Sequence, residues 1–504
     1  MENLARTLTP TLTPGGAFCV AVIGGGYAGM AAAVELADAG VTVTVFEAAP
    51  VLGGRARRVL HRGTVLDNGL HIGIGAYRSL LDLGARVRGD ASAGPGTPGA
   101  TGWIRRPLDW RILGGSIRGD IHLRAPRWPA PLHLAAALAG ARGLSIGARW
   151  DALRLIAGLR RNDWRVDPAL TVGDWLAVRR QCASIVDALW GPLCVAALNT
   201  PLHTASAQVF AHVLRDSLGA DRGASDLLLP ATDLTELFPA PAALHVEARG
   251  GTILCGQRVE RIERLEPGLD EGRHGHQQAQ QHERQHERQH GVQHRHRPGY
   301  RVILRGDPAP TGDIRFDALV LATAPRALAD LVADWPALQS VHRQVIRYTH
   351  EPITSIYLQY PETIALAGPM LGLAAAAGDP GQWVFDRGQL TGQRGLLGVV
   401  ISASAAQRAT EAAILAEAVH QQLARLVPGL PRPAWSKVIT EKLATFTCTP
   451  GLDRPGTTTE APGVFLAGDH VASDYPATLE GAVRSGQLAA RAAVAYRHRR
   501  ACPP

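Results

Sequence analysis

The apolar and polar residues of the first fifty positions follow a pattern that predicts a strand, a helix and a second strand. Residues 18–23 form an uninterrupted apolar run, as expected for a parallel strand buried on both faces. Residues 28–39 are rich in alanine and suit one helix, and residues 41–46 alternate β-branched residues before a phenylalanine. Two strands joined by such a helix predict a βαβ unit, and hence an α/β fold with a parallel sheet.

The turn between the first strand and the helix carries the pattern Gly-x-Gly-x-x-Gly. Gly24 permits the tight turn, Gly26 lets the backbone approach a pyrophosphate, and Gly29 lets the helix pack closely on the strand. The positive end of the helix then points at the phosphates. Glu47 ends the second strand, where an acid binds ribose hydroxyls. This order of elements predicts a dinucleotide site.

A second glycine-rich segment, residues 53–58, follows at a spacing from Glu47 that flavin-dependent amine oxidases and phytoene-type desaturases share. Its Gly54 and Arg55 resemble the second phosphate and ribityl contact of those enzymes, with Arg55 as the charge partner. An exposed basic turn is the alternative for this motif taken alone.

Two segments in the middle of the chain extend the same pattern. Residues 250–259 form a glycine turn that leads into a short β-ribbon, and a valine at the place of Val259 offers its backbone to adenine in this superfamily. Residues 316–325 are predicted to form a buried strand that ends near the cofactor.

The last piece lies near the end of the chain. Residues 463–469 predict a strand that ends in Gly468 and Asp469, with the acid facing a ribityl chain, and a helix at about 478–496 would direct its N-terminus at a flavin ring. The separate pieces occur in the expected order and together predict FAD as the cofactor, held by a two-dinucleotide-binding-type domain with a Rossmann-like parallel sheet and a β-ribbon.

The spacing of these pieces predicts a discontinuous FAD domain made of residues 18–90, 242–335 and 455–497. Two inserted segments, residues 91–241 and 336–454, would form an α+β substrate lobe over the flavin, as in amine oxidases.

Two further segments have compositions of their own. Residues 101–150 combine aliphatic residues, proline and arginine with Trp103, Trp110 and Trp128, a mixture that suits either a lipid-facing surface or an ordinary apolar helix. Residues 271–296 hold seven histidines and almost no apolar residue, so we interpret them as a disordered insertion and not as a metal site. Residues 1–17 are predicted to be a flexible tail without a signal peptide.

Composition narrows the class of protein. The chain has 504 residues, 46% of them hydrophobic, which suits a globular protein with a sizeable core. Its formal net charge is +8. The sequence contains no nucleic-acid-binding motif, so this excess of positive charge alone does not predict a nucleic-acid partner. The six cysteines are scattered without metal-ligand or disulfide spacing, as expected for a cytoplasmic protein.

Seven blocks outside the common flavin motifs resemble the hydroxysqualene dehydroxylase family, also called squalene-associated FAD-dependent desaturases. These blocks are residues 67–71, 189–200, 205–210, 225–230, 382–388, 445–451 and 476–486. The resemblance implies replacement of the hydroxyl of hydroxysqualene, an apolar C30 isoprenoid, by hydride from reduced FAD, beside two prenyl-synthase-like partners in bacterial hopanoid synthesis. Independently of the resemblance, the net positive charge and the composition of residues 101–150 suit peripheral contact with the inner face of the cytoplasmic membrane. Leu70 and His470 depart from the family pattern, which has a polar residue and a tryptophan there.

The proposed chemistry needs a proton donor in a dry, apolar site, because loss of water from an allylic alcohol leaves a delocalised cation. Asp67, His71 and Asp226 are the candidate catalytic residues, although each also has a structural interpretation as a turn cap, a core histidine or a lobe hinge. The stretch 189–200 would line the tunnel for the polyprenyl chain, with three of its residues as the named contacts: Leu193, Ala197 and Asn199.

Other functions stay open at this point. A carotenoid or phytoene desaturase would use the same scaffold to remove hydride from a polyene. An amine oxidase commonly supports its flavin with a lysine, and here only Lys437 and Lys442 are available. A prenyl-lipid escort protein would need no redox chemistry, but the intact cofactor motifs argue against it.

Overall fold

The computed structural model describes residues 18–89, 102–116, 119–219, 221–265, 299–306, 315–374, 376 and 378–501. The predicted tail at 1–17 and the histidine-rich insertion at 271–296 lie outside the described residues.

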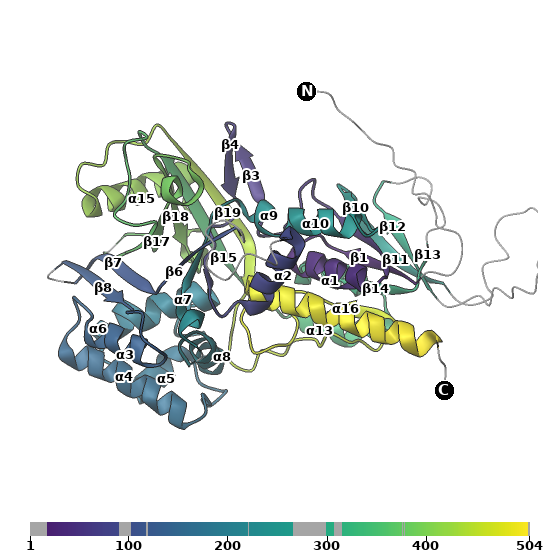
Figure 1. The fold of residues 1–504 in the computed structure, drawn as a ribbon, viewed down its shortest axis with the longest axis horizontal. Coiled ribbons are helices and arrows are strands. Elements are labelled where there is room, and N and C mark those ends of the chain that lie inside the picture. Colours follow the sequence, from purple (N-terminus) through teal and green to yellow (C-terminus); the bar gives the residue numbers. More distant parts are fainter. Residues whose placement is uncertain are drawn as a thin grey trace, which may run out of the picture.

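Two sheets organise the molecule, and Figure 1 shows them side by side. The first is a five-stranded, entirely parallel sheet in the order β10-β2-β1-β14-β20. Its strands come from widely separated parts of the chain: β1 (Cys19–Ile23), β2 (Thr42–Glu47), β10 (Thr252–Cys255), β14 (Ala318–Leu321) and β20 (Val464–Leu466). Most side chains of the four strands β1, β2, β14 and β20 are buried, as expected when helices cover both faces, whereas those of the edge strand β10 are partly exposed.

Two helices pack tightly against each other beside this sheet, namely α1 (Tyr27–Asp38) and α16 (Leu479–Ala501). A Cβ atom at Gly486 would lie 2.1 Å from the carbonyl oxygen of Ala28, so only glycine permits this crossing. Helix α1 begins one residue before the predicted range 28–39. Helix α16 ends at Ala501, five residues beyond the expected end at residue 496.

The β-ribbon begins later than expected. The residues after the Gly250 turn form β10, an edge strand of the parallel sheet, and the antiparallel ribbon starts only at β11. This ribbon consists of β11 (Val259–Leu265), β12 (Gly299–Leu304) and β13 (Arg315–Phe316). Around it and the parallel sheet lie α2 (Arg78–Arg88), α9 (Leu234–Leu237), α10 (Pro239–Glu247), α12 (Pro325–Val332) and α13 (Gln339–Val345).

The second large sheet has seven strands in the order β19-β15-β18-β17-β16-β7-β8. It joins β7 (Asp109–Ser116) and β8 (Gly119–Arg124) to β15 (His350–Gln359), β16 (Met370–Leu373), β17 (Trp383–Asp386), β18 (Leu396–Ile401) and β19 (Trp435–Phe446). The two inserted segments therefore build one sheet together. Helix α15 (Ala412–Leu426) covers it, and α14 (Arg387–Thr391) follows β17.

A group of helices lies below the seven-stranded sheet in Figure 1. It comprises α3 (Leu132–Ala139), α4 (Ile146–Arg161), α5 (Val172–Val178), α6 (Ala183–Ile185), α7 (Gly191–Leu198) and α8 (Ala207–Leu214). Three short strands form a separate small sheet in the order β5 (Gly73–Ile74), β9 (Leu227–Pro230) and β6 (Trp103–Arg106). Strand β3 (Arg58–His61) pairs with β4 (Thr64–Asp67) as a hairpin.

Of the three tryptophans named in segment 101–150, for which a lipid-facing surface and an apolar core were both open, two are in the core. Trp103 and Trp110 are buried because β6 and β7 carry them into the protein, whereas Trp128 is 56% exposed. Among the described residues, no helix combines the length and apolar character required to cross a bilayer. The same residues contain no cluster of three or more side chains that could hold a metal ion.

Candidate functional site

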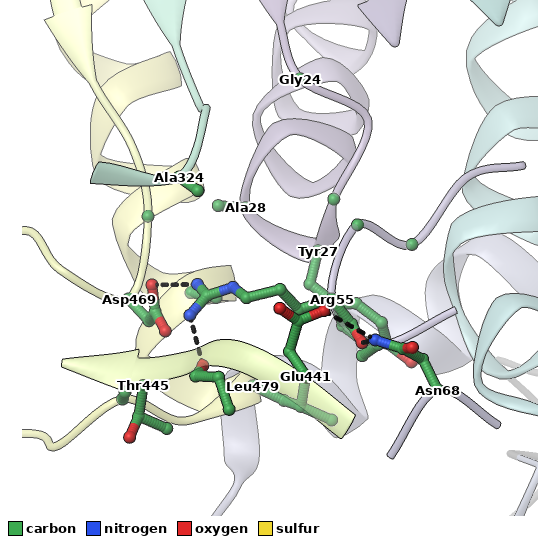
Figure 2. Close-up of a pocket in the computed structure, with 18 of the residues that line it drawn as sticks. Gly24, Tyr27, Ala28, Arg55, Asn68, Ala324, Glu441, Thr445, Asp469 and Leu479 are labelled. Carbon is green, nitrogen blue, oxygen red and sulfur yellow. Dashed lines mark hydrogen bonds and ion pairs between the residues drawn. The ribbon is translucent and has the colours of Figure 1, made fainter. Parts of the chain in front are cut away.

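A cavity of about 610 Å³ lies at the carboxyl ends of the parallel strands. Gly24 and Gly26 line it after β1, Glu47 lines it at the end of β2, and Gly468 and Asp469 line it after β20. Ligands of open parallel sheets bind at this edge, where the strand order reverses. Figure 2 shows this cavity with Gly24 at one end and residues of β19 at the other.

The first turn is shaped by steric contacts that exclude side chains. Gly24 has φ +112°, and a Cβ atom there would lie 2.6 Å from the carbonyl oxygen of Ala322. A Cβ atom at Gly29 would lie 1.8 Å from the carbonyl oxygen of Gly24, which presses α1 against the turn. Gly29 is not on the cavity wall, so it supports the site from behind. Gly26 has no such conflict, and its bare backbone faces the cavity beside Gly54.

Glu47 is fixed by two backbone amides. Its Oε2 accepts from the N–H of Gly25 at 2.7 Å, and its Oε1 accepts from the N–H of Ala49 at 2.7 Å. The carboxylate thus lies against the glycine turn, at the same end of the cavity as Val259. An acid held there suits the hydroxyls of a ribose.

Arg55 and Asp469 form an ion pair in the cavity wall, with Nη2 of Arg55 2.6 Å from Oδ1 of Asp469 (Figure 2). The Nη1 of Arg55 donates to the carbonyl oxygen of Ala444. Burial favours the protonated carboxyl, but the Arg55 guanidinium, together with the neighbouring His470 ring, outweighs it and holds the pKa of Asp469 well below its ordinary value. The two charged side chains therefore face an incoming cofactor as an oriented, nearly neutral pair.

Ala477, Thr478 and Leu479 bring the N-terminus of α16 to the same cavity. Free N–H groups at a helix start attract negative charge. The same cavity is thus lined by an acid for ribose, a glycine turn for the diphosphate, a basic residue and a helix N-terminus. This donor set fits FAD.

A second cavity of about 140 Å³ adjoins the first and is almost entirely apolar. Five residues line both cavities and mark where they meet: Ile72, Tyr77, Ala196, Ala197 and Thr478. The second cavity continues between α3, α4 and α7, where Leu134, Leu138, Ile156 and Leu189 line it. The site therefore joins a polar cofactor cavity to a narrow hydrophobic one.

The comparisons with known proteins agree with this geometry. A family model described as flavin containing amine oxidoreductase matches residues 237–494, just over half of the chain, and one described as NAD(P)-binding Rossmann-like domain matches residues 22–86. The chain belongs to the flavin containing amine oxidoreductase family. It is an FAD-dependent oxidoreductase, and the cofactor predicted from the sequence is confirmed.

Individual relatives cover nearly the whole chain. The chain is 29% identical to the hydroxysqualene dehydroxylase of Rhodopseudomonas palustris, over 94% of its own length and 97% of that protein. It is 30% identical to a carotenoid phi-ring synthase of Streptomyces griseus, over 95% and 88% of the two chains. A triple mutant of putrescine oxidase has the same fold, with a TM-score of 0.68, 18% identity, and 95% and 99% coverage.

The predicted tunnel residues are divided between the two cavities. Leu193 lines the second cavity, Asn199 lines the first, and Ala197 stands at the junction. Asn199 has a left-handed backbone with φ 48° at the end of α7. Its side chain donates to Thr445 Oγ1 and accepts from the N–H of Ala403, which joins α7 to the seven-stranded sheet.

Asp67, one of the predicted catalytic residues, is not on the wall of either cavity. It is 2% exposed, and its Oδ2 accepts from Nη1 of Arg387 at 2.9 Å. Its Oδ1 accepts from the N–H of Leu234 at 2.9 Å. Both oxygens are used inside the protein, because β4 turns this side chain away from the cofactor side.

Asp226 is also outside both cavities. Its Oδ2 accepts from Nε of Arg105 at 2.8 Å, and its backbone carbonyl accepts from the N–H of Gly75. Its neighbours Ser225 and Leu227 line the second cavity, whereas the carboxylate turns towards β6. These contacts support the structural interpretation of Asp226.

His71 does line the cofactor cavity. Its Nδ1 lies 2.8 Å from the carbonyl oxygen of Gly69, and since a carbonyl only accepts, Nδ1 carries the proton. Burial lowers the pKa of His71 below its ordinary value, so the ring is neutral at pH 7 and Nε2 is an acceptor. Such a ring can orient a hydroxyl or receive a proton.

Sequence reasoning missed a carboxylate in the cavity wall. Glu441 on β19 accepts from Nδ2 of Asn68 at 3.0 Å, and Figure 2 shows the two side chains facing each other near Arg55. Its neighbour in sequence, Lys442, is exposed. Successive side chains of a strand point to opposite faces, so Glu441 and Lys442 lie on different sides of β19. This two-residue period was the only sequence signal that could have placed Glu441 in the cavity wall.

Proposed function

We propose that this protein catalyses the reductive dehydroxylation of hydroxysqualene to squalene with FAD. The observation that carries the proposal is the narrow apolar cavity that opens into the cofactor cavity beside Ala197. A long hydrocarbon chain fits such a space, whereas a small charged amine would leave it unfilled. The similarity to the enzymes of Rhodopseudomonas palustris and Sinorhizobium fredii, both named hydroxysqualene dehydroxylase, supports the same substrate.

The walls around the expected reaction centre suit a cationic intermediate. Leu70, Ile353, Trp383, Phe385 and Val400 line the cavity between the nucleotide end and the seven-stranded sheet. These side chains exclude water, which would otherwise capture an allylic cation. When bound in its reduced form, FAD would supply the hydride for this reaction.

Two polar side chains of this cavity are proposed to handle the hydroxyl group. His71 presents a neutral ring whose Nε2 can accept from the substrate hydroxyl and orient it. Glu441 is the carboxyl group in the wall that can carry a proton to the departing oxygen. Asp67 and Asp226 are assigned no contact with substrate, because their carboxylates are engaged elsewhere.

The decisive experiment uses photoreduced protein without oxygen, to which hydroxysqualene is added. Reoxidation of the flavin with a matching amount of squalene is expected. Glu441→Gln and His71→Phe should slow this single turnover at least about a hundredfold, whereas Asp226→Asn should leave its rate unchanged. A flavin that stays reduced in the wild-type protein would refute the proposed reaction.

Oxidative desaturation of a polyene is the second candidate. The 30% identity to a carotenoid phi-ring synthase and the 25% identity to a probable zeta-carotene desaturase of Synechococcus elongatus favour it specifically. Oxidised protein mixed with phytoene or a related polyene tests this reaction, and bleaching of the flavin with formation of a more unsaturated product would establish it.

We further propose that the substrate enters from a membrane surface and is supplied there by prenyl-synthase-like enzymes. Four large apolar side chains on or near α3 and α4 are more than half exposed: Trp128, Leu132, Ile146 and Trp150. Ile146 and Trp150 are one helical turn apart and share a face. The other face of these helices lines the second cavity. Exposed arginines nearby, Arg124, Arg127 and Arg142, suit an anionic bilayer.

Sedimentation with liposomes tests this contact. Wild-type protein should pellet with vesicles that contain phosphatidylglycerol, and the double variant Trp128→Ser/Trp150→Ser should remain in the supernatant. An Ile414→Ser variant removes an equally exposed apolar residue on α15 and should pellet like the wild type. Equal sedimentation of all three would contradict the proposed surface.

A further inference from the structure

Two polar side chains of the cofactor cavity, the buried His470 and the half-buried Thr323, have buried polar atoms without a hydrogen-bond partner anywhere in the described residues. They are His470, with both ring nitrogens unpaired, and Thr323, with its hydroxyl unpaired. His470 is 1% exposed, and both residues line the cavity. Buried polar atoms are nearly always paired in folded proteins, because an unpaired one loses its contacts with water and gains nothing in return.

Their positions in the fold are related. Thr323 lies two residues after β14, and His470 lies four residues after β20. These strands are neighbours in the parallel sheet, with Leu319 paired to Val464 and Leu321 to Leu466. The carboxyl ends of parallel strands meet at one edge, so both unpaired groups belong to the edge that receives the cofactor.

The ring of His470 is held firmly in this place. A Cβ atom at Gly468 would lie 2.3 Å from its Cε1, so the ring occupies space that only a glycine leaves open. The hydroxyl of Tyr348 donates to the backbone carbonyl of His470. Its Nδ1 is 3.8 Å from Oδ1 of Asp469, which is too long for a hydrogen bond. The unpaired nitrogens are therefore a property of a defined site and not of a loose side chain.

The charges around the ring indicate what it binds. Arg55 is paired with Asp469, so its positive charge is largely compensated before any ligand arrives. The diphosphate of FAD is anionic, and its ribityl chain carries several hydroxyls. A cavity that binds this segment needs hydrogen-bond donors in addition to Arg55.

We infer that His470 is a cofactor-binding residue that donates an N–H to an oxygen of the ribityl–diphosphate segment of FAD, with the hydroxyl of Thr323 as a neighbouring contact. The unpaired groups lower the stability of the protein without FAD and contribute affinity once FAD is bound. His470 stands where the resembling family has a tryptophan, whose indole N–H is also a donor.

The test compares two buried histidines. His470→Phe keeps an aromatic ring and removes both nitrogens, and it should weaken FAD binding at least about tenfold. Because it removes unpaired polar atoms, it should leave the melting temperature of the FAD-free protein unchanged or raise it. In the control His420→Phe, a ring outside the cavity loses its hydrogen bond with the hydroxyl of Tyr360. That variant should melt at a lower temperature and bind FAD normally.

FAD affinity is measured from the fluorescence released when holoprotein is diluted, and stability from thermal unfolding with and without added FAD. His470→Gln and His470→Trp retain an N–H donor and should recover most of the affinity, whereas Thr323→Val should weaken binding less than His470→Phe. Unchanged FAD affinity in His470→Phe would overturn the inference. The inference would also be overturned if His470→Phe lost FAD affinity and, to a similar degree, lowered the melting temperature of the FAD-free protein, because that result indicates a purely structural role. None of these readouts depends on the substrate.

Discussion

Replacing Asp67 by alanine should destabilise the protein strongly without changing its chemistry. Asp67 and Arg387 are 2% and 3% exposed and form an ion pair of 2.9 Å between β4 and the start of α14. Removing one member of such a pair leaves an uncompensated buried charge, which costs about 3–5 kcal/mol. The N–H of Leu234 also loses its acceptor. Because whole domains are stable by only about 5–15 kcal/mol, this single change is a large fraction of the total.

A double variant separates the structural role from a catalytic one. In Asp67→Leu/Arg387→Met the guanidinium is removed together with the carboxylate, so most of the lost free energy of unfolding should return. The free energy of unfolding is measured by urea titration followed by circular dichroism. The flavin reoxidation assay on folded holoprotein then reports the chemistry. If stability is restored but the single-turnover rate remains at least about a hundredfold below that of the wild type, the reasoning is refuted. Asp67 would then again be a catalytic candidate.

Three further predictions follow from the cavity. Gly29→Val places side-chain atoms within 1.8 Å of the carbonyl oxygen of Gly24, so the purified protein should lack the yellow FAD absorbance; retention of normal absorbance would contradict the contact. Ala197→Phe fills the junction of the two cavities, so it should retain a wild-type flavin spectrum while turnover of the C30 substrate falls at least about tenfold; unchanged turnover would exclude this route. The pKa of Asp469 is lower in the folded state than in the unfolded one. The ionised Asp469 side chain therefore contributes fully to the free energy of unfolding above the ordinary carboxyl pKa of about 4, and this contribution is lost as the pH falls towards the pKa of the folded state. Asp469→Asn should therefore flatten the loss of stability below pH 4 in acid titrations followed by circular dichroism, and an unchanged acid profile would contradict the pairing with Arg55.

The cofactor half of the site could be predicted because its chemistry depends on the backbone. Gly24, Gly29 and Gly468 stand where a Cβ atom would collide with neighbouring atoms, and such positions remain visible in a sequence as glycines at set intervals. Glu47 and Asp469 follow directly from the ends of predicted strands. Local periodicity and steric exclusion were sufficient here.

The substrate half could not be predicted to the same depth. Asp67, Asn68 and His71 are neighbours in sequence, yet the carboxylate of Asp67 turns to Arg387 while Asn68 and His71 face the cofactor cavity. Glu441 reaches the same cavity from β19, far away in the chain. Which of these side chains meets the substrate depends on how β4 packs against the seven-stranded sheet.

The sequence by itself determined the FAD-type parallel sheet, its glycine turn and the acids at its strand ends, since each follows from a few neighbouring residues and their backbone geometry. Only the tertiary structure decided that the inserted segments share one sheet, that an apolar cavity opens beside Ala197, and that His470 is buried without a partner. The physical reason is that burial and charge pairing are set by contacts between distant segments, and a linear pattern of residue types does not specify which distant side chains meet.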